Sequence, residues 1–293
     1  MRIKIIGDGV WGKAIYSVVR QNYSDVCILK RDEKTTNQDI VILCVPTQSI
    51  RDCLKYVSFS GENRIIINTA KGIEKSTHLL PSQIIYSVFG ENIDYYTLIG
   101  PSFAGEVVKK MPTLINLGYK KRYKNIEKIK EVFQTDYFRV RLTTGFEVLE
   151  LSAAFKNIYA IACGLAQGLG YGVNTRVELF VLALEEMKSL YENLHLNQDS
   201  QITAGTSGDL MLTCNSTESR NFTFGDFLAK YSVNESLDKI NSTVEGFHSL
   251  NSIEYFKKKA GVTLPLATFI STIVQLNNPK KVKKYFDDFI KLT

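Results

Sequence analysis

The stretch Ile3–Gly12 (IKIIGDGVWG) decides the fold that we expect for this chain. It opens with a short isoleucine-rich run, typical of a buried strand, and residues 13–21 behind it have the apolar spacing of a helix. Gly7, Gly9 and Gly12 thus form a Gly-x-Gly-x-x-Gly turn between strand and helix, where this pattern predicts a dinucleotide phosphate site. The three glycines would allow the tight turn, the approach of a pyrophosphate to the backbone, and close helix packing. A tight turn without a ligand is the alternative.

Further short apolar runs predict more strands of the same sheet, at residues 26–29, 40–45, 65–68 and 97–99. Brief runs without polar alternation are typical of parallel strands that are covered on both faces. Because they alternate with helical segments, they predict an α/β fold with a doubly wound parallel Rossmann sheet. We expect this dinucleotide-binding domain to occupy residues 1–144.

The second half of the sequence has long helical periodicity instead. Apolar stripes at residues 146–164, 176–194 and 222–231 predict helices, and no segment there reads convincingly as a strand. Asn278-Pro279 is typical of a helix start, with asparagine as the cap and proline at the first helical position. We therefore expect an all-helical substrate and catalytic domain at residues 145–293.

Composition and charge restrict the class of protein. The chain has 293 residues, of which 44% are hydrophobic and 23% charged, and these values favour an ordinary globular protein over disordered, fibrous or membrane classes. The net charge of +6 is modest, and no basic stripe with interleaved aromatic residues is present, so we expect no nucleic-acid partner. The five cysteines are odd in number and form no C-x-x-C pair, which fits a reducing cytoplasm.

One apolar stretch could imitate a membrane span. Residues 157–175 carry no charge, but glycines, Gln167 and Asn174 interrupt them. We interpret the stretch as a buried helix with a glycine-rich exit and expect no stable membrane insertion.

Lys156 stands out without any knowledge of relatives. On a helix its neighbours three, four and seven positions away are mostly small or apolar. Burial on such a stripe is costly for an ammonium, and it would lower the pKa of Lys156 and prepare it for proton transfer near neutral pH. The alternative is a lysine whose long stem reaches water. Glu150 and Asn157 share an adjacent stripe and could orient Lys156 or a substrate.

Two polar clusters suggest how ligands would be held. After the second predicted strand comes Lys30-Arg31-Asp32, where an acidic residue would bind a ribose 2′-hydroxyl and a basic one a 2′-phosphate, so the choice between NAD and NADP stays open. Ser219-Arg220-Asn221 precedes a helical run and suits a phosphate monoester, with helix capping by Ser219 or Asn221 as the alternative. The three histidines lack ligand spacing, so no metal is expected.

Together these motifs resemble the bacterial-type NAD(P)-dependent glycerol-3-phosphate dehydrogenase family. The matching segments, in chain order, are Gly7–Gly12 (GDGVWG), Asn68–Glu74 (NTAKGIE), Gly100–Val107 (GPSFAGEV), Ala154–Ile158 (AFKNI), Gly208–Cys214 (GDLMLTC), Glu218–Gly225 (ESRNFTFG) and Val244–Gly246 (VEG). The resemblance implies hydride transfer between dihydroxyacetone phosphate and sn-glycerol 3-phosphate for phospholipid precursor synthesis. It also implies NAD or NADP as cofactor, a small phosphate ester as substrate, and a cytoplasmic homodimer.

The resemblance further implies residue roles, with Lys156 as the catalytic lysine. The implied substrate-binding residues are Lys71, Gly100, Ser102, Lys156, Asp209, Ser219, Arg220 and Asn221. The implied cofactor-binding residues are Gly7, Gly9, Trp11, Gly12, Arg31, Lys71, Ala104, Arg220 and Glu245.

The chain departs from the family pattern at Asp8, Gly105, Ala153 and Thr206, the last of which replaces a glycine before Gly208-Asp209. Because none of these changes removes a charged catalytic group, we expect activity. The alternative is a catalytically weak, nucleotide-binding regulatory protein of the same fold.

Overall fold

The computed structural model describes residues 1–36, 38–59, 64–120 and 125–292. It divides into two compact units. The sheet unit comprises Met1–Leu151 and Asp199–Asp209, and the helical unit comprises Ser152–Gln198 and Leu210–Thr293. The division into domains at residues 1–144 and 145–293 stays a prediction.

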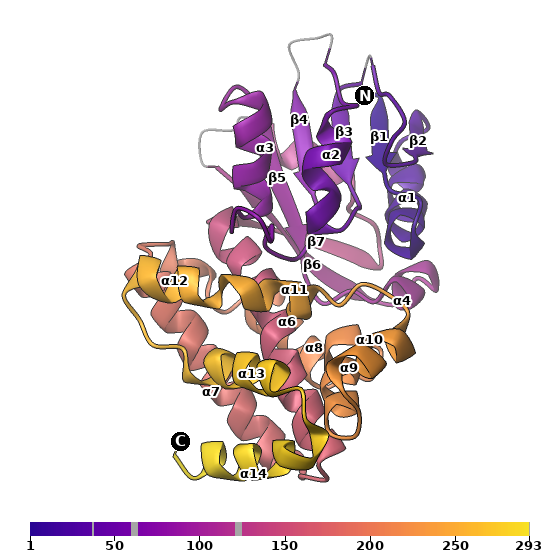
Figure 1. Ribbon diagram of the computed structural model, residues 1–293. Coiled ribbons are helices and arrows are strands. Elements are labelled where there is room, and N and C mark those ends of the chain that lie inside the picture. Colours follow the sequence, from indigo (N-terminus) through magenta and orange to yellow (C-terminus); the bar gives the residue numbers. More distant parts are fainter. Residues whose placement is uncertain (37, 60–63, 121–124, 293) are drawn as a thin grey trace. The chain divides into compact units, whose positions relative to one another are not determined.

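Among its described residues, the sheet unit has seven strands in the order β2-β1-β3-β4-β5-β6-β7 (Figure 1). Their bounds are β1 (Ile3–Ile6), β2 (Val26–Leu29), β3 (Ile40–Leu43), β4 (Ile65–Asn68), β5 (Asp94–Ile99), β6 (Thr113–Tyr119) and β7 (Phe138–Thr144). Strand β1 lies between β2 and β3 and is parallel to both, so the strand order reverses at β1. In doubly wound sheets, ligands bind at the carboxyl ends of the strands at such a point.

The predicted doubly wound sheet is confirmed, and the structure adds two strands. The runs at 26–29 and 65–68 match β2 and β4, and the run at 97–99 is the end of the longer β5. The apolar runs of the sequence predict neither β6 nor β7. Because β6 is antiparallel to β5 and parallel to β7, the sheet is mostly rather than wholly parallel.

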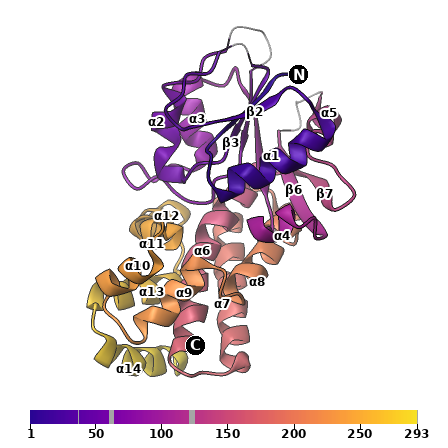
Figure 2. The same cartoon turned by 90° about the vertical axis from the view of Figure 1, so that its right-hand side faces the viewer.

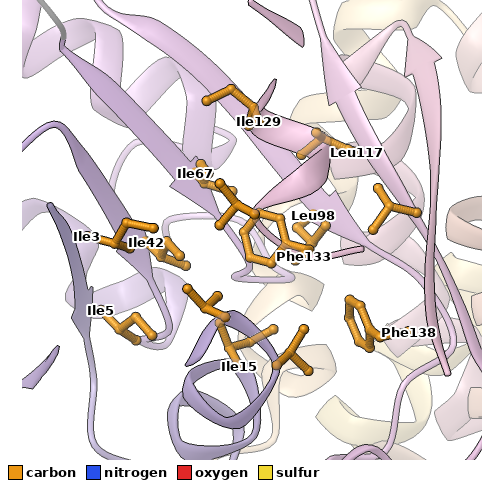
Figure 3. Packing of buried hydrophobic residues seen from close by; sticks show 14 of the residues in the cluster. Ile3, Ile5, Ile15, Ile42, Ile67, Leu98, Leu117, Ile129, Phe133 and Phe138 are labelled. Carbon is orange, nitrogen blue, oxygen red and sulfur yellow. The ribbon is translucent and has the colours of Figure 1, made fainter. Parts of the chain in front are cut away.

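Consecutive residues of the central strands serve two different cores. Ile40 and Ile42 of β3 belong to the cluster packed against helix α1, whereas Val41 and Leu43 belong to the one on the opposite face. Figure 3 shows the first cluster, where Ile15 of α1 lies close to strand residues. Burial on both faces explains why these strands read as unbroken apolar runs.

Helices cover both faces of the sheet. Within this unit, α1 and α5 lie on one face and α2 and α3 on the other (Figure 2). The bounds are α1 (Val10–Asn22), α2 (Ile50–Leu54), α3 (Pro81–Phe89), α4 (Ala104–Val108) and α5 (Ile126–Glu131). The returning segment 199–209 adds one turn of π-helix, η3 (Ala204–Gly208), to the sheet unit.

The rest of the chain is helical, as expected, and no strand occurs among its described residues. The bounds are α6 (Phe146–Gly168), α7 (Val173–Asn193), α8 (Asp209–Cys214), α9 (Arg220–Leu228), α10 (Val233–Ile240), α11 (Glu245–Ser249), α12 (Ile253–Ala260), α13 (Pro265–Leu276) and α14 (Pro279–Ile290). Helix α14 begins as predicted, since the Asn278 side chain accepts a hydrogen bond from the Lys280 N–H at 3.2 Å.

Two glycines bring α6 and α9 into backbone contact. A Cβ at Gly164 of α6 would lie 1.8 Å from the carbonyl oxygen of Phe222, and one at Gly225 of α9 would lie 2.0 Å from that of Ile161. Only glycine therefore fits at either position. The contact fixes α9, which carries Arg220, beside the C-terminal half of α6.

Helix α6 is the apolar segment that could imitate a membrane span. Among the described residues it is the one helix long and apolar enough to cross a membrane, and its most apolar window is wholly buried in the structure. The predicted buried helix is thus observed, and its glycine-rich exit lies between Gly168 and Val173, where α7 begins.

Candidate active site

The glycine turn at the end of β1 has a backbone that side chains would disrupt. Gly7 has a φ of +114°, and a Cβ there would lie 2.4 Å from the carbonyl oxygen of Cys44. A Cβ at Gly12 would lie 1.9 Å from the carbonyl oxygen of Gly7. Both glycines are thus required by the strand-turn-helix connection itself.

Gly9 is different, because a Cβ there would meet nothing within 4 Å. It is the N-cap of α1 and borders a cavity of about 350 Å³ at the carboxyl ends of the first three strands. The lining residues are Gly7, Asp8, Gly9, Lys30, Arg31, Asp32, Cys44, Val45 and Pro46. An open space against bare backbone, at the positive end of a 13-residue helix, fits the pyrophosphate of a dinucleotide.

The charged residues after β2 lie where the sequence predicted them. Lys30, Arg31 and Asp32 are exposed and line this cavity. Both signs of charge are present, so the structure keeps NAD and NADP as alternatives. Two other proposed cofactor residues, Trp11 and Ala104, are partly buried and pack against the core cluster that includes α1.

Lys71 and Asp209 form an ion pair in the sheet unit. The Lys71 Nζ lies 2.8 Å from Oδ2 of Asp209 and donates a second hydrogen bond to the Gly100 carbonyl at 2.9 Å. The Asp209 side chain is 2% exposed and that of Lys71 is 23% exposed. The Ser102 hydroxyl also donates to the Gly100 carbonyl, at 3.0 Å. Four of the proposed substrate residues therefore gather in one cluster.

Lys156 lies in the middle of α6 and is 4% exposed. The structure thus favours the buried lysine over the alternative of a side chain that reaches water. Its Nζ donates a 2.6 Å hydrogen bond to the hydroxyl of Thr213 on α8. Thr213 lies within a segment that matches the family pattern, but neither its spacing nor the resemblance predicted a role for it. Its position four residues after Asp209, hence on the same face of a short helix, was the available signal.

Asn157, which follows Lys156 on α6, belongs to a set of hydrogen bonds that connects α6, α9 and α11. Asn221 of α9 donates through Nδ2 to Oδ1 of Asn157 at 2.9 Å, and its own Oδ1 accepts from the Gly246 N–H of α11 at 2.9 Å. All three residues are buried. Asn157 therefore holds Asn221, and the prediction that Asn157 orients Lys156 or a substrate stays a prediction.

The remaining residues of the predicted phosphate cluster have different environments. Ser219 caps α9 by accepting from the Phe222 N–H at 3.3 Å, so the capping alternative applies to this residue. Arg220 is exposed, and one of its guanidinium nitrogens donates to the Ser242 hydroxyl at 2.9 Å. Glu245 is the first residue of α11, directly before Gly246.

Glu150 does not orient Lys156 through any contact that the structure shows. Its carboxylate accepts hydrogen bonds from the Ser82 N–H at 3.1 Å, from the Ser82 hydroxyl at 2.6 Å, and from the Tyr95 hydroxyl. Burial raises the pKa of Glu150 to about 8, against the opposing effect of these hydrogen bonds. The helical spacing suggested a partner for Lys156, but Glu150 instead holds the start of α3.

Metal ligands do not cluster in the described part of the chain. No group of three His, Cys, Asp or Glu side chains is placed there to hold an ion.

Comparison with known families gives two matches. The model described as the NAD-dependent glycerol-3-phosphate dehydrogenase N-terminus matches residues 32–125, and the model of the C-terminus matches residues 146–285.

Individual relatives agree with the family models. A glycerol-3-phosphate dehydrogenase (NAD(P)+) of Staphylococcus haemolyticus is 32% identical over 291 residues, covering 93% of this chain and 87% of the relative. One from Syntrophomonas wolfei is 34% identical over 260 residues, covering 86% and 74%. Among solved structures, glycerol-3-phosphate dehydrogenase from Coxiella burnetii has a TM-score of 0.88 at 22% identity, covering 99% of this chain and 98% of the other, which shows a shared fold.

Proposed function

Because this chain belongs to the NAD-dependent glycerol-3-phosphate dehydrogenase family, we propose that it interconverts dihydroxyacetone phosphate and sn-glycerol 3-phosphate. The cofactor is NAD or NADP, and the product serves as a phospholipid precursor. The observation that carries the proposal is the buried ammonium of Lys156, hydrogen-bonded to Thr213. Burying a lysine ammonium in an apolar helix costs folding free energy, and buried ionisable groups of this kind are typical of functional sites.

The cofactor's place in the proposal is the glycine turn of the sheet unit. Gly7, Gly9 and Gly12 leave the backbone bare, and the start of α1 would hold the pyrophosphate. Arg31, Trp11 and Ala104 would contact other parts of the dinucleotide. When bound, the nicotinamide supplies or accepts the hydride at the C2 carbon of the substrate. The chain's own residues do the binding and move the proton.

Lys156 acts as the general acid. As the carbonyl is reduced, negative charge develops on its oxygen, and the Lys156 ammonium donates a proton there. In the reverse direction the neutral amine accepts the proton from the hydroxyl. The Thr213 hydroxyl accepts from Nζ and thereby orients it.

The other charged groups bind and orient the substrate. Lys71, held by Asp209, adds positive charge that stabilises the developing alkoxide. Arg220 and Asn221 at the start of α9 grip the phosphate, and Glu245 beside them contacts the cofactor. Binding energy gained at the phosphate then positions the reacting C2 carbon, which is distant from the phosphate charge.

The catalytically weak regulatory protein is the second candidate, but no specific observation favours it. Lys156, Asp209 and Arg220 are all present, and the side chains of Lys156 and Asp209 are both buried and hydrogen-bonded. We further propose a homodimer in the cytoplasm. The cytoplasmic location is supported by the cysteine pattern of the sequence, in which five cysteines, an odd number, form no C-x-x-C pair.

The assay that tests the function follows cofactor absorbance after dihydroxyacetone phosphate is added, with NADH and NADPH in parallel. A substrate-dependent fall with either cofactor supports the enzyme. Cofactor binding without any oxidation would instead support the regulatory protein.

A further inference from the structure

Thr206 lies in the π-helical turn η3, which leads directly into Asp209. We propose that Thr206 and Asn116 are positioning residues that set the Asp209 carboxylate against Lys71. The inference rests on the proposed function, because it concerns the same reaction, but it assigns roles to residues outside the substrate and cofactor sets.

The Thr206 hydroxyl forms hydrogen bonds that stabilise the turn. It donates to the Gln201 carbonyl at 2.8 Å, accepts from the Thr203 N–H at 2.9 Å, and lies 3.0 Å from the Thr203 hydroxyl. Thr206 is fully buried, so water cannot replace these hydrogen bonds. One hydroxyl therefore satisfies both a donor and an acceptor group at the start of the turn.

The Thr206 backbone is hydrogen-bonded to the Asp209 backbone, so the position of Thr206 affects that of Asp209. The Asp209 N–H donates to the Thr206 carbonyl, and the Gly208 N–H donates to the Thr203 carbonyl at 3.1 Å. A shift of Thr206 would move the acceptor that holds the Asp209 backbone. Because the Asp209 carboxylate lies 2.8 Å from the Lys71 Nζ, such a shift would change that pair directly.

Asn116 attaches the turn to the sheet. It lies on β6 and is 2% exposed, and its Oδ1 accepts from the Gly205 N–H at 2.8 Å. Its Nδ2 donates to the hydroxyl of Thr143 on β7, so both ends of the amide are engaged. The turn is thereby fixed to two strands of the core rather than left as a surface loop.

This network accounts for a departure from the family pattern. The resemblance places a glycine where Thr206 stands, and a glycine has no hydroxyl with which to join Gln201 and Thr203. Thr206 is not among the residues with a positive φ, so the threonine costs no backbone strain. The turn in this chain therefore depends on a side chain that a glycine at this position could not supply.

The test compares T206V, which keeps the shape but removes the hydroxyl, with T206S, which keeps the hydroxyl. Ser207→Ala is the matched control in the same turn, since its hydroxyl makes only a 3.4 Å contact with the Thr203 carbonyl. At temperatures well below melting, we expect T206V to lower kcat about tenfold or more, because small displacements of positioned groups are costly. T206S and the control should stay near wild type, and the KM for the cofactor should not change.

A second readout does not depend on activity. Acylation of Lys71 by acetic anhydride in the cofactor-free protein, measured by mass spectrometry against the exposed Lys188, reports how firmly Asp209 holds the ammonium. We expect several-fold faster acylation of Lys71 in T206V and no change in T206S. If T206V does not fold, T206A makes the same deletion without the extra methyl group.

The outcomes separate the two proposals. An inactive wild type, under conditions where it binds cofactor, would overturn the proposed function, while the acylation rates would still test the positioning role. Wild-type kcat and wild-type Lys71 acylation in a folded T206V would overturn the positioning role and leave the function intact. A lower melting temperature alone, with both readouts unchanged, would show that Thr206 only stabilises the fold.

Discussion

The Nζ of Lys156 lies 2.6 Å from the hydroxyl oxygen of Thr213, and both residues are buried. An ammonium in an apolar helix needs acceptors, and this hydroxyl supplies one without adding a negative charge. A carboxylate in place of the Thr213 hydroxyl would bind the ammonium more strongly and oppose transfer of its proton. The pair therefore suits a group that must both hold and release a proton.

Replacing Thr213 by valine should slow turnover. The valine keeps the volume but removes an acceptor worth about 1–2 kcal/mol, and one such loss in the transition state corresponds to roughly a tenfold lower kcat. Steady-state kinetics would measure the change, with Thr213→Ser as the variant that should restore the rate. A valine variant with normal kcat would show that this hydrogen bond has no part in catalysis.

The glycine turn offers a matched pair of substitutions. Gly9→Ala adds a methyl group into open space, so we expect normal melting and weaker cofactor binding. Gly12→Ala places a methyl group 1.9 Å from a carbonyl oxygen, so we expect destabilisation by about 2 kcal/mol or more. Calorimetry and a cofactor titration distinguish the two effects. Unchanged cofactor affinity in Gly9→Ala would argue against a pyrophosphate at this turn.

The stability of the sheet unit should depend on the protonation of Glu150. Burial raises its pKa to about 8 from an unfolded value of 4.5, so the protonated carboxyl stabilises the folded state. This contribution is complete below about pH 4.5 and is lost as the pH rises through 8.

Glu150→Gln imitates the protonated form and should flatten that dependence. The slope of the unfolding free energy should change by up to about 1.4 kcal/mol per pH unit between these limits. Urea titrations from pH 5 to pH 8 would measure it, with the surface substitution Glu192→Gln as the control. An identical slope in wild type and Glu150→Gln would contradict the assignment.

Arg220 should matter for the phosphate and little for the fold. It is exposed, and Arg220→Gln removes a charged donor worth about 1.5–3 kcal/mol to an anion. We expect kcat/KM for dihydroxyacetone phosphate to fall about 10- to 100-fold, while the low activity on dihydroxyacetone, which lacks the phosphate, stays constant. Lys188→Gln, on the exposed surface of α7, controls for a general loss of positive charge. An equal loss on both substrates would remove Arg220 from the phosphate site.

Much of the fold could be predicted from the sequence because burial leaves a local signal. The unbroken apolar runs of β3 and β4 and the Asn278-Pro279 helix start are such signals. Strand β7 does alternate apolar and polar residues, but Arg139 and Arg141 make it look like a surface segment. Its place at the sheet edge and the reversed direction of β6 depend on contacts distant in sequence.

The site was predictable where a residue type is costly in its local pattern. Lys156 on an apolar stripe is the best example. The partners were not predictable, since Glu150 shares a stripe with Asn157 but contacts Ser82 and Tyr95 on other elements. Helical spacing gives the face of a residue and not what packs against that face.

The most direct test of the account is the turnover of Lys156→Met with dihydroxyacetone phosphate and the preferred reduced cofactor. Methionine fills the buried site without an ionisable group, so folding and cofactor binding should persist while the proton donor is lost. We predict a kcat lower by about 10²- to 10⁴-fold, with normal melting and normal cofactor affinity. A folded, cofactor-binding variant that turns over at the wild-type rate would contradict the assignment of Lys156 as the general acid.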